Sequence, residues 1–211
     1  MPAKYEFYYF NGHGLGIIPR LLLSLGGFDW KDKFVENWKE EKGKTPFTHV
    51  PVLTEYSEDG SKFVLAEAYA IYRYLARKMN IVGETEQEVA LVEQYCCSWE
   101  ELHDKYWPLV SDWKKILTPE QFDNCLKKLL ETELKPIMTK HEEALAKNGT
   151  GFYVGDKMTL ADIHATISLP LLNIDGKLIS KETHPNLFAL HEKLSANDIF
   201  QSEAKRFPSN T

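Results

Sequence analysis

The sequence predicts an α/β domain followed by an all-helical domain. In the first 79 residues, short alternating apolar runs are separated by segments with apolar residues at helical spacing, in the order strand, helix, strand, helix, strand, strand, helix. A polar stretch over 80–85, which contains Gly83, separates this half from a half with no strand pattern. We therefore predict domains over 1–79 and 86–211, joined by a linker over 80–85.

The first three elements are predicted to form a βαβ unit. Residues 4–10 alternate between apolar and polar side chains, as a half-buried strand does. Residues 15–25 carry apolar side chains at helical spacing and stop at Gly26-Gly27, and residues 28–35 form a second candidate strand. Two strands joined by a helix pair in parallel, through a right-handed crossover, by default.

The next segment leads into a third strand. Residues 38–44 are short and charged and predict an irregular helix. A strand then opens at 50–53, where Pro51 is tolerated because its position at the strand start needs no ladder hydrogen bond. A bend at this proline fits either a cis or a trans peptide bond, and the sequence does not distinguish them.

A β-hairpin and a helix complete the first domain. Residues 56–61 contain an Asp-Gly pair, which is typical of tight turns, and residues 62–65 return as an antiparallel strand. A helix is predicted over 66–79. Its apolar face is expected to hold Ala70, Ile71, Tyr74 and Leu75.

The second half begins with a long predicted helix over 86–111. The Thr-Pro-Glu-Gln sequence at 118–121 then has the pattern of a capping box with proline in the first turn. We expect the helix that it starts to run to Lys147, with a bend near Pro136 and an end at Asn148-Gly149.

Three further helices are predicted. The Thr-Leu-Ala-Asp sequence at 159–162 again places an acid where it can reach back to the helix cap. The helix that follows, to about residue 172, is largely apolar, so we expect it to be buried. Residues 185–196 and 198–207 supply the last two helices.

The composition argues against several classes of function. The chain of 211 residues has a net charge of −6 and no long basic block, which argues against a nucleic-acid or anionic-membrane partner. The N-terminal residues lack a signal-peptide core, and no apolar run is long enough to span a bilayer. The cysteines are odd in number and fit a reducing cytoplasm. The histidines show no ligand spacing, so we expect no metal site.

Tyr9 lies where the first strand meets the following helix, across a turn that contains Gly12 and Gly14. Unpaired N–H groups and the helix dipole favour an anion at such a point. A tyrosine hydroxyl there can hydrogen-bond a thiolate and so lower the pKa of the thiol. From this stretch alone, a core aromatic residue with a solvated tip is the simpler explanation.

Four short motifs follow one another along the chain. They are Tyr9-Phe10-Asn11 with Gly14, Trp38 and Lys42 with Val50-Pro51-Val52-Leu53, Ala70 to Ala76, and Gly155 to Asp162. In order and spacing they resemble the cytosolic glutathione S-transferases over about residues 4–207. The resemblance implies a thioredoxin-like N-terminal domain, βαβαββα, and an all-α C-terminal domain. It is greatest with the sigma class, which includes prostaglandin D synthases and S-crystallins.

The resemblance also implies an activity and its reactants. Glutathione is the co-substrate, no cofactor is needed, and the second substrate is a small hydrophobic electrophile. Members of the family are cytoplasmic homodimers. Tyr9 corresponds to the tyrosine that hydrogen-bonds the glutathione sulfur and favours the thiolate. Tyr8 lies on the opposite strand face because strand side chains alternate.

By the same resemblance, Trp38 and Lys42 bind the glycine carboxylate of glutathione. Val50, held by Pro51, offers its backbone to the cysteinyl part. Glu67 accepts the γ-glutamyl ammonium. Without the resemblance, Lys42 is a solvated lysine, Trp38 a partly buried indole, and Glu67 an acid that complements the helix dipole.

The predicted helical domain supplies the remaining candidates. Glu101 aligns with the acid that the family lends across its dimer to the glutathione of the partner. The candidate apolar wall of the electrophile site consists of Phe10, Leu15, Leu102, Tyr106 and Trp107. Aromatic residues at such positions are more often part of the core.

The chain departs from the family pattern at two positions. Leu15 stands where the family has an arginine near the sulfur, and Ala68 replaces a serine that bonds the γ-glutamyl carboxylate. His13 is close enough in sequence to substitute in part for the arginine. A charge-assisted hydrogen bond contributes about 1.5–3 kcal/mol, so both losses weaken glutathione binding or activation.

Three alternatives to conjugation therefore stay open. The chain can have kept the fold and lost activity, with a binding or structural role like that of the crystallins. It can be a glutathione-dependent isomerase. It can also carry apolar ligands at the dimer cleft.

Overall fold

The computed structural model describes residues 4–172, 176 and 178–207. The chain forms two compact units. One contains the residues up to 81 together with those from 195 onward, and the other contains residues 82–194. The first division falls inside the stretch that we predicted as a linker.

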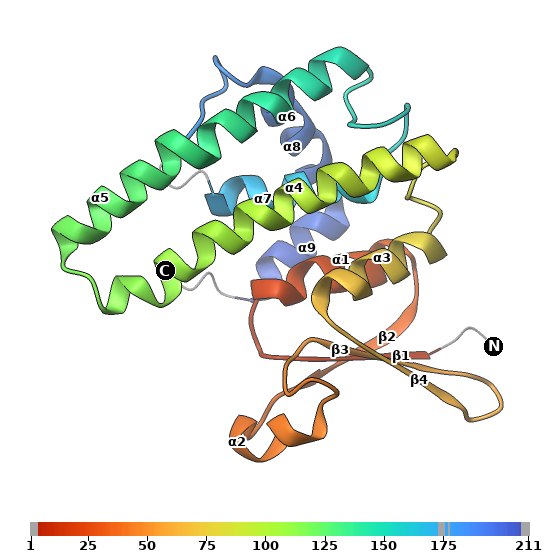
Figure 1. Ribbon diagram of the computed structural model, residues 1–211. Coiled ribbons are helices and arrows are strands. Elements are labelled where there is room, and N and C mark those ends of the chain that lie inside the picture. The colour runs from red at the N-terminus through yellow and green to blue at the C-terminus, as the bar shows by residue number, and fades with distance from the viewer. Residues whose placement is uncertain (1–3, 173–175, 177, 208–211) are drawn as a thin grey trace. The chain divides into compact units, whose positions relative to one another are not determined.

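A four-stranded mixed sheet forms the centre of the first unit (Figure 1). Its strands are β1 (Lys4–Tyr9), β2 (Asp29–Phe34), β3 (Val52–Tyr56) and β4 (Lys62–Ala66), in the spatial order β2-β1-β3-β4. β1 pairs in parallel with β2 and antiparallel with β3, and β3 pairs antiparallel with β4. This topology confirms the predicted βαβ unit and the predicted hairpin.

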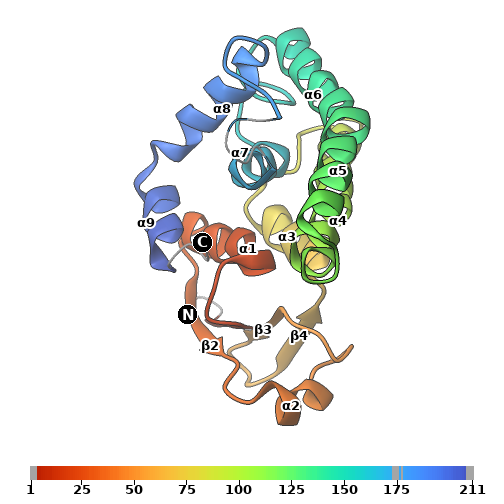
Figure 2. The same cartoon turned by 90° about the vertical axis from the view of Figure 1, so that its left-hand side faces the viewer.

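Helices lie on both sides of this sheet (Figure 2). α1 (Ile17–Leu25) and α3 (Ala68–Lys78) pack against each other on one side. α2 (Trp38–Glu41), on the other side, continues into a 3-10 turn over Lys42–Lys44, which is the irregular helix that the charged segment predicted.

The core of this unit lies between the sheet and the α1–α3 pair. Its large members are apolar side chains that are at most 1% exposed, and each contributes about 1.5–3 kcal/mol through burial. They are Phe7, Leu21, Leu22, Leu23, Leu53, Ile71 and Leu75.

Helix α9 (Asp198–Arg206) belongs to the first unit, although we expected it in the helical domain. It packs against α1, and its Phe200 is buried. Its hydrophobic spacing predicted a helix correctly. That spacing carries no information on which partner the apolar face contacts.

The buried face of α3 differs from the prediction. Ile71 and Leu75 are fully buried as expected, but Ala70 and Tyr74 are only half-buried. Tyr72 instead is 2% exposed, and its hydroxyl donates a hydrogen bond to the Leu15 carbonyl at 3.0 Å. The buried stripe is rotated because α3 packs against α1 as well as against the sheet.

The second unit is helical in its described part. Its helices are α4 (Glu86–Ser111), α5 (Pro119–Leu129), α6 (Lys135–Asn148), α7 (Leu160–Leu172) and α8 (Pro185–Ser195), with a 3-10 turn over Trp113–Lys115. Figure 1 shows α5 and α6 as one long run beside α4. The run is joined by a π-helical turn over Leu130–Leu134, just before Pro136.

The caps of these helices follow the sequence patterns. Thr118 accepts from the Gln121 N–H, and Gln121 accepts from the Thr118 N–H, which confirms the predicted capping box. α6 ends at Gly149, in the left-handed conformation (φ +71°). Asp162 accepts from the N–H groups of Thr159 and Tyr153 at 2.7 and 2.8 Å. α7 packs against α4 and is largely buried, as predicted.

Candidate active site

Tyr9 is the last residue of β1, and its side chain is 9% exposed. Its hydroxyl oxygen accepts a hydrogen bond from the peptide N–H of Leu15, with 3.1 Å between the heavy atoms. Leu15 lies in a 3-10 turn over Gly14–Gly16 that leads into α1. The first N–H groups of a helix have no acceptor within the helix, and for Leu15 the Tyr9 hydroxyl supplies one. The strand–helix junction predicted around Tyr9 is present.

The surroundings keep the Tyr9 hydroxyl protonated. Burial raises the pKa of Tyr9, while the Leu15 N–H and the positive charge of Arg20 act to lower it. The net pKa lies above the ordinary value, so the hydroxyl keeps its proton at neutral pH. Because its oxygen is the acceptor toward Leu15, the proton can be donated to a ligand.

Two glycines allow the backbone to approach the Tyr9 ring. A Cβ at Gly16 would lie 2.5 Å from Tyr9 Cδ1 and 2.8 Å from Arg20 Nη1. A Cβ at Gly14 would lie 2.7 Å from the Tyr9 hydroxyl oxygen, and Gly14 has φ +41°. A Cβ at Gly12 would meet nothing within 4 Å. Two of these three glycines therefore serve the tyrosine as well as the turn.

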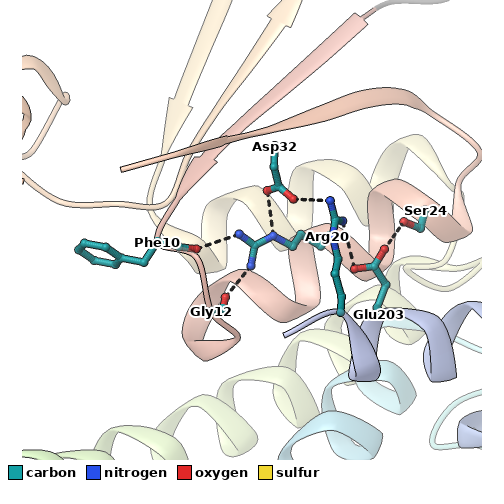
Figure 3. A network of polar contacts seen from close by, with 7 residues as sticks. Phe10, Gly12, Arg20, Ser24, Asp32 and Glu203 are labelled. Atoms are coloured by element: carbon teal, nitrogen blue, oxygen red, sulfur yellow. Dashed lines mark hydrogen bonds and ion pairs between the residues drawn. The ribbon is translucent and has the colours of Figure 1, made fainter. Parts of the chain in front are cut away.

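Arg20 is the principal residue of this region that we did not predict from the sequence. It lies in α1 and is 1% exposed. Its guanidinium donates to the carbonyls of Phe10 and Gly12 at 3.0 and 2.7 Å, and to Asp32 Oδ1 at 2.9 Å (Figure 3). It therefore fixes the loop that directly follows Tyr9. The sequence contains one signal for it, a charged residue within an apolar helix. Arginine is almost never fully buried unless it is paired, so such a residue indicates a buried ion pair.

His13 does not take the place of the missing arginine. Its Nε2 lies 3.0 Å from the carbonyl oxygen of Phe207, and its ring stands edge-on to the Phe207 ring at 5.4 Å between centroids. The imidazole is thus engaged with the end of α9. The expectation that His13 stands in for the arginine beside the sulfur loses its support.

Phe10 and Trp38 form an aromatic extension of the Tyr9 region. The Phe10 ring packs against the Tyr9 ring at 5.6 Å and edge-on against the Trp38 ring at 5.5 Å. Phe10 is 42% exposed and Trp38 is half-buried, so both present surface to solvent. Lys42, in the turn after α2, is exposed. Tyr9, Phe10 and Trp38 are therefore brought together, with Lys42 one turn beyond Trp38.

Val50 and Pro51 precede β3 instead of opening it. The peptide bond between them is cis. The β1–β3 register ends at the pair Tyr8 and Val52, so the backbone of Val50 lies beyond the last paired residue. Val50 is half-buried and Pro51 is buried. The predicted strand start is two residues early because this cis proline sits outside the ladder.

Glu67 occupies an unusual backbone conformation at the start of α3. Its φ and ψ angles are +72° and +118°, and its carbonyl accepts from the Ile71 N–H at 3.0 Å. Residues other than glycine pay about 1–3 kcal/mol for such a conformation, and these residues cluster at functional sites. The Glu67 side chain is exposed and makes no cap hydrogen bond, whereas Ala68 is 6% exposed.

The candidates on α4 have different surroundings. Glu101 is exposed and paired with Lys105 at 2.8 Å. Tyr106 is 4% exposed, and Trp107 is 51% exposed. Leu102 is fully buried, so it is a core residue and not part of a site wall, because a side chain without exposed surface presents none to a ligand.

Among the described residues, no group of three or more His, Cys, Asp or Glu side chains is arranged to hold a metal ion. In the same part of the chain, every helix is too short or too polar to cross a bilayer.

Comparison with known proteins decides the family. The family described as glutathione S-transferase, C-terminal domain, matches residues 103–200. Glutathione S-transferase 1 of Ascaris suum is 34% identical, over 79% of this chain and 79% of its own length. The chain belongs to the glutathione S-transferase family.

Two other similarities bear on this glutathione S-transferase. S-crystallin SL11 of Nototodarus sloanii is 32% identical, over 98% of this chain and 97% of that protein. The solved sigma class transferase of Fasciola hepatica matches 98% of both chains with a TM-score of 0.84 and 23% identity, which shows the fold. The first unit of this family member is therefore thioredoxin-like, and the second is the helical domain.

Proposed function

We propose that this chain is a glutathione transferase that binds glutathione on its thioredoxin-like unit and activates the thiol through Tyr9. The observation that carries the proposal is the Tyr9 hydroxyl, which accepts from the Leu15 N–H and keeps its own proton to donate. A free thiol has a pKa of about 8.5. A hydrogen bond donated to the thiolate favours the charged form and lowers that pKa.

The reaction then needs little from the protein besides this bond. The thiolate attacks the electrophilic carbon and a C–S bond forms. In a substitution the leaving group departs with its electron pair, and in an addition the carbon skeleton accepts the displaced electron pair. The thiol proton passes to solvent. Glutathione acts as co-substrate, and no cofactor enters the scheme. Holding both reactants in place supplies the remaining acceleration.

We assign each part of glutathione to a binding residue around Tyr9. Lys42 and Trp38 bind the glycine carboxylate. The Val50 backbone, set by the cis bond to Pro51, pairs with the cysteinyl part. Glu67 receives the γ-glutamyl ammonium, and the strained backbone at Glu67 supports this assignment.

The proposal also covers the second substrate and the assembly. Phe10, Leu15, Tyr106 and Trp107 are proposed for the electrophile site, and Phe10 and Trp107 have the exposed apolar surface that such a site needs. A sigma-class, cytoplasmic homodimer is proposed, in which Glu101 serves the glutathione of the partner. Sizing of the wild-type chain tests the dimer, and Glu101→Gln should then weaken glutathione binding.

A structural role is the second candidate. Leu15 and Ala68 remove two polar groups from the glutathione site, and S-crystallin SL11 is similar over 98% of this chain. A conjugation assay with a panel of electrophiles separates the two. Product formation in proportion to protein concentration supports the transferase, whereas glutathione binding without turnover supports the structural role. A panel of isomerase substrates tests the glutathione-dependent isomerase.

A further inference from the structure

The loop after Tyr9 is linked to the last helix through two arginines that share one aspartate. Arg20 donates to Asp32 Oδ1 at 2.9 Å while it holds the loop carbonyls. The other oxygen of the same carboxylate lies 2.7 Å from Arg206 Nη2, at the end of α9. The side chains of Arg20 and Asp32 are 1% and 4% exposed. A buried pair with a third, more exposed partner thus joins α1, β2 and α9.

The end of α9 is held to α1 by a second acid. Arg206 Nη1 lies 3.4 Å from Glu203 Oε2. The other oxygen of Glu203 accepts a hydrogen bond from Ser24 of α1 at 2.8 Å (Figure 3). Positive and negative charges alternate along this series of ion pairs, from Arg20 through Asp32 and Arg206 to Glu203. Each of these charges therefore has at least one neighbour of opposite sign.

Phe207 covers Arg20 from another direction. The Arg20 guanidinium carbon lies 4.4 Å from the centre of the Phe207 ring, which is close enough for a cation–π contact. Phe207 is 6% exposed, and its carbonyl is the group that contacts His13 of the Tyr9 loop. Phe207 therefore touches the loop directly, through His13, as well as through Arg20.

We propose that Arg206 and Phe207 are positioning residues for the step that Tyr9 catalyses. They fix the guanidinium of Arg20, and Arg20 fixes the Phe10 and Gly12 carbonyls, on which the position of the Tyr9 hydroxyl depends. Removing Arg206 leaves Asp32 Oδ2 without its charged partner, so the carboxylate can shift together with the Arg20 guanidinium that is bound to its other oxygen. This inference rests on the proposed function.

The test compares Arg206→Gln with Lys205→Gln. Lys205 is an exposed neighbour on the same helix, so its variant removes the same charge without touching Asp32. Arg206→Gln should lower kcat about tenfold with little change in KM for glutathione, because small misplacements of a catalytic group are costly. The bound thiol should also ionise at higher pH. Arg206→Lys should recover part of both losses, and Lys205→Gln should behave as wild type.

A second readout does not depend on turnover. Hydrogen exchange of the Leu15 N–H, which donates to Tyr9, should accelerate in Arg206→Gln and in Phe207→Leu but not in Lys205→Gln. A folded Arg206→Gln variant with wild-type kcat, thiol titration and exchange would overturn the inference. A wild-type chain without transferase activity would sink the proposed function, and the exchange comparison would still decide the role of α9.

Discussion

The hydroxyl oxygen of Tyr9 and the peptide N–H of Leu15 meet at 3.1 Å, and the Leu15 carbonyl accepts from Tyr72 at 3.0 Å. Leu15 is thus fixed on both sides of its backbone, although its side chain departs from the family pattern. The departure removes the charged side chain that the family pattern has at this position. It leaves intact the backbone donor that orients Tyr9.

Tyr9→Phe removes the proposed donor to the thiolate. We expect kcat for conjugation to fall about 100-fold, as when one preorganised donor to a developing charge is lost, with glutathione affinity nearly unchanged. Tyr8→Phe is the matched control, because the Tyr8 hydroxyl donates to Glu41 on the other side of the strand. Steady-state kinetics measure both variants. Equal turnover in Tyr9→Phe and wild type would rule out the role of Tyr9.

Gly16→Ala places a methyl group 2.5 Å from the Tyr9 ring and 2.8 Å from Arg20. Either the ring or the guanidinium must shift, so kcat should fall and the free energy of unfolding should drop by about 1–3 kcal/mol. Gly12→Ala is the control, since its Cβ meets nothing within 4 Å. Denaturant unfolding and kinetics test the pair. Similar behaviour of the two variants would show that the approach to Tyr9 is not tight.

Ala68→Ser restores a hydroxyl at the first residue of α3. If this end of the helix binds the γ-glutamyl carboxylate, the dissociation constant of glutathione should fall about tenfold or more, the effect of one charge-assisted hydrogen bond. Ala70→Ser, on the same helix and half-buried, should not change it. Calorimetric titration gives the dissociation constants. A gain of the same size at both positions would tell against the assignment.

His141 predicts a pH dependence of stability. It is 2% exposed, stacks on Trp99 at 4.5 Å and lies 3.0 Å from the Ser98 hydroxyl. Burial lowers its pKa from 6.5 to about 4. Between these two pH values the unfolded chain binds a proton that the folded chain does not. Above pH 6.5 His141 therefore makes its full contribution to the free energy of unfolding. As the pH falls from 6.5 to about 4, this contribution is lost, and the free energy of unfolding decreases by about 3 kcal/mol.

The variant His141→Gln isolates this contribution. Its loss of stability between pH 7 and pH 5 should be smaller than that of wild type by about 2 kcal/mol, which is the part of the window above pH 5. His49→Gln, at an exposed position, should keep the wild-type dependence. Denaturant unfolding at both pH values gives the comparison. An equal loss of unfolding free energy between the two pH values in His141→Gln and wild type would contradict a neutral buried imidazole.

Elements whose partners are close in sequence could be predicted. The Thr118–Gln121 capping box and the end of α6 at Gly149 depend on residues within one turn, and both are present. The strand–helix junction at Tyr9 also follows from local pattern. The backbone of Glu67 could not be predicted, because a φ of +72° is imposed by the join between β4 and α3 and is rare for glutamate.

Features that depend on residues far apart in the sequence could not be predicted. The burial of Arg20 depends on Asp32 and Arg206, which come from different elements, and no short pattern connects them. For the same reason the docking of α9 on α1 was missed. The choice of Tyr72 over Tyr74 as the buried tyrosine of α3 depends on how that helix meets α1, since the two residues differ by only half a turn.

The most direct test of the central claim is the ultraviolet absorbance of the glutathione thiolate in complex with the protein, recorded against pH. We predict that the thiolate of bound glutathione appears near neutral pH, well below the pH at which free glutathione ionises, and that Tyr9→Phe abolishes this difference. Bound glutathione that ionises at the same pH as free glutathione would contradict the activation of the thiol by Tyr9.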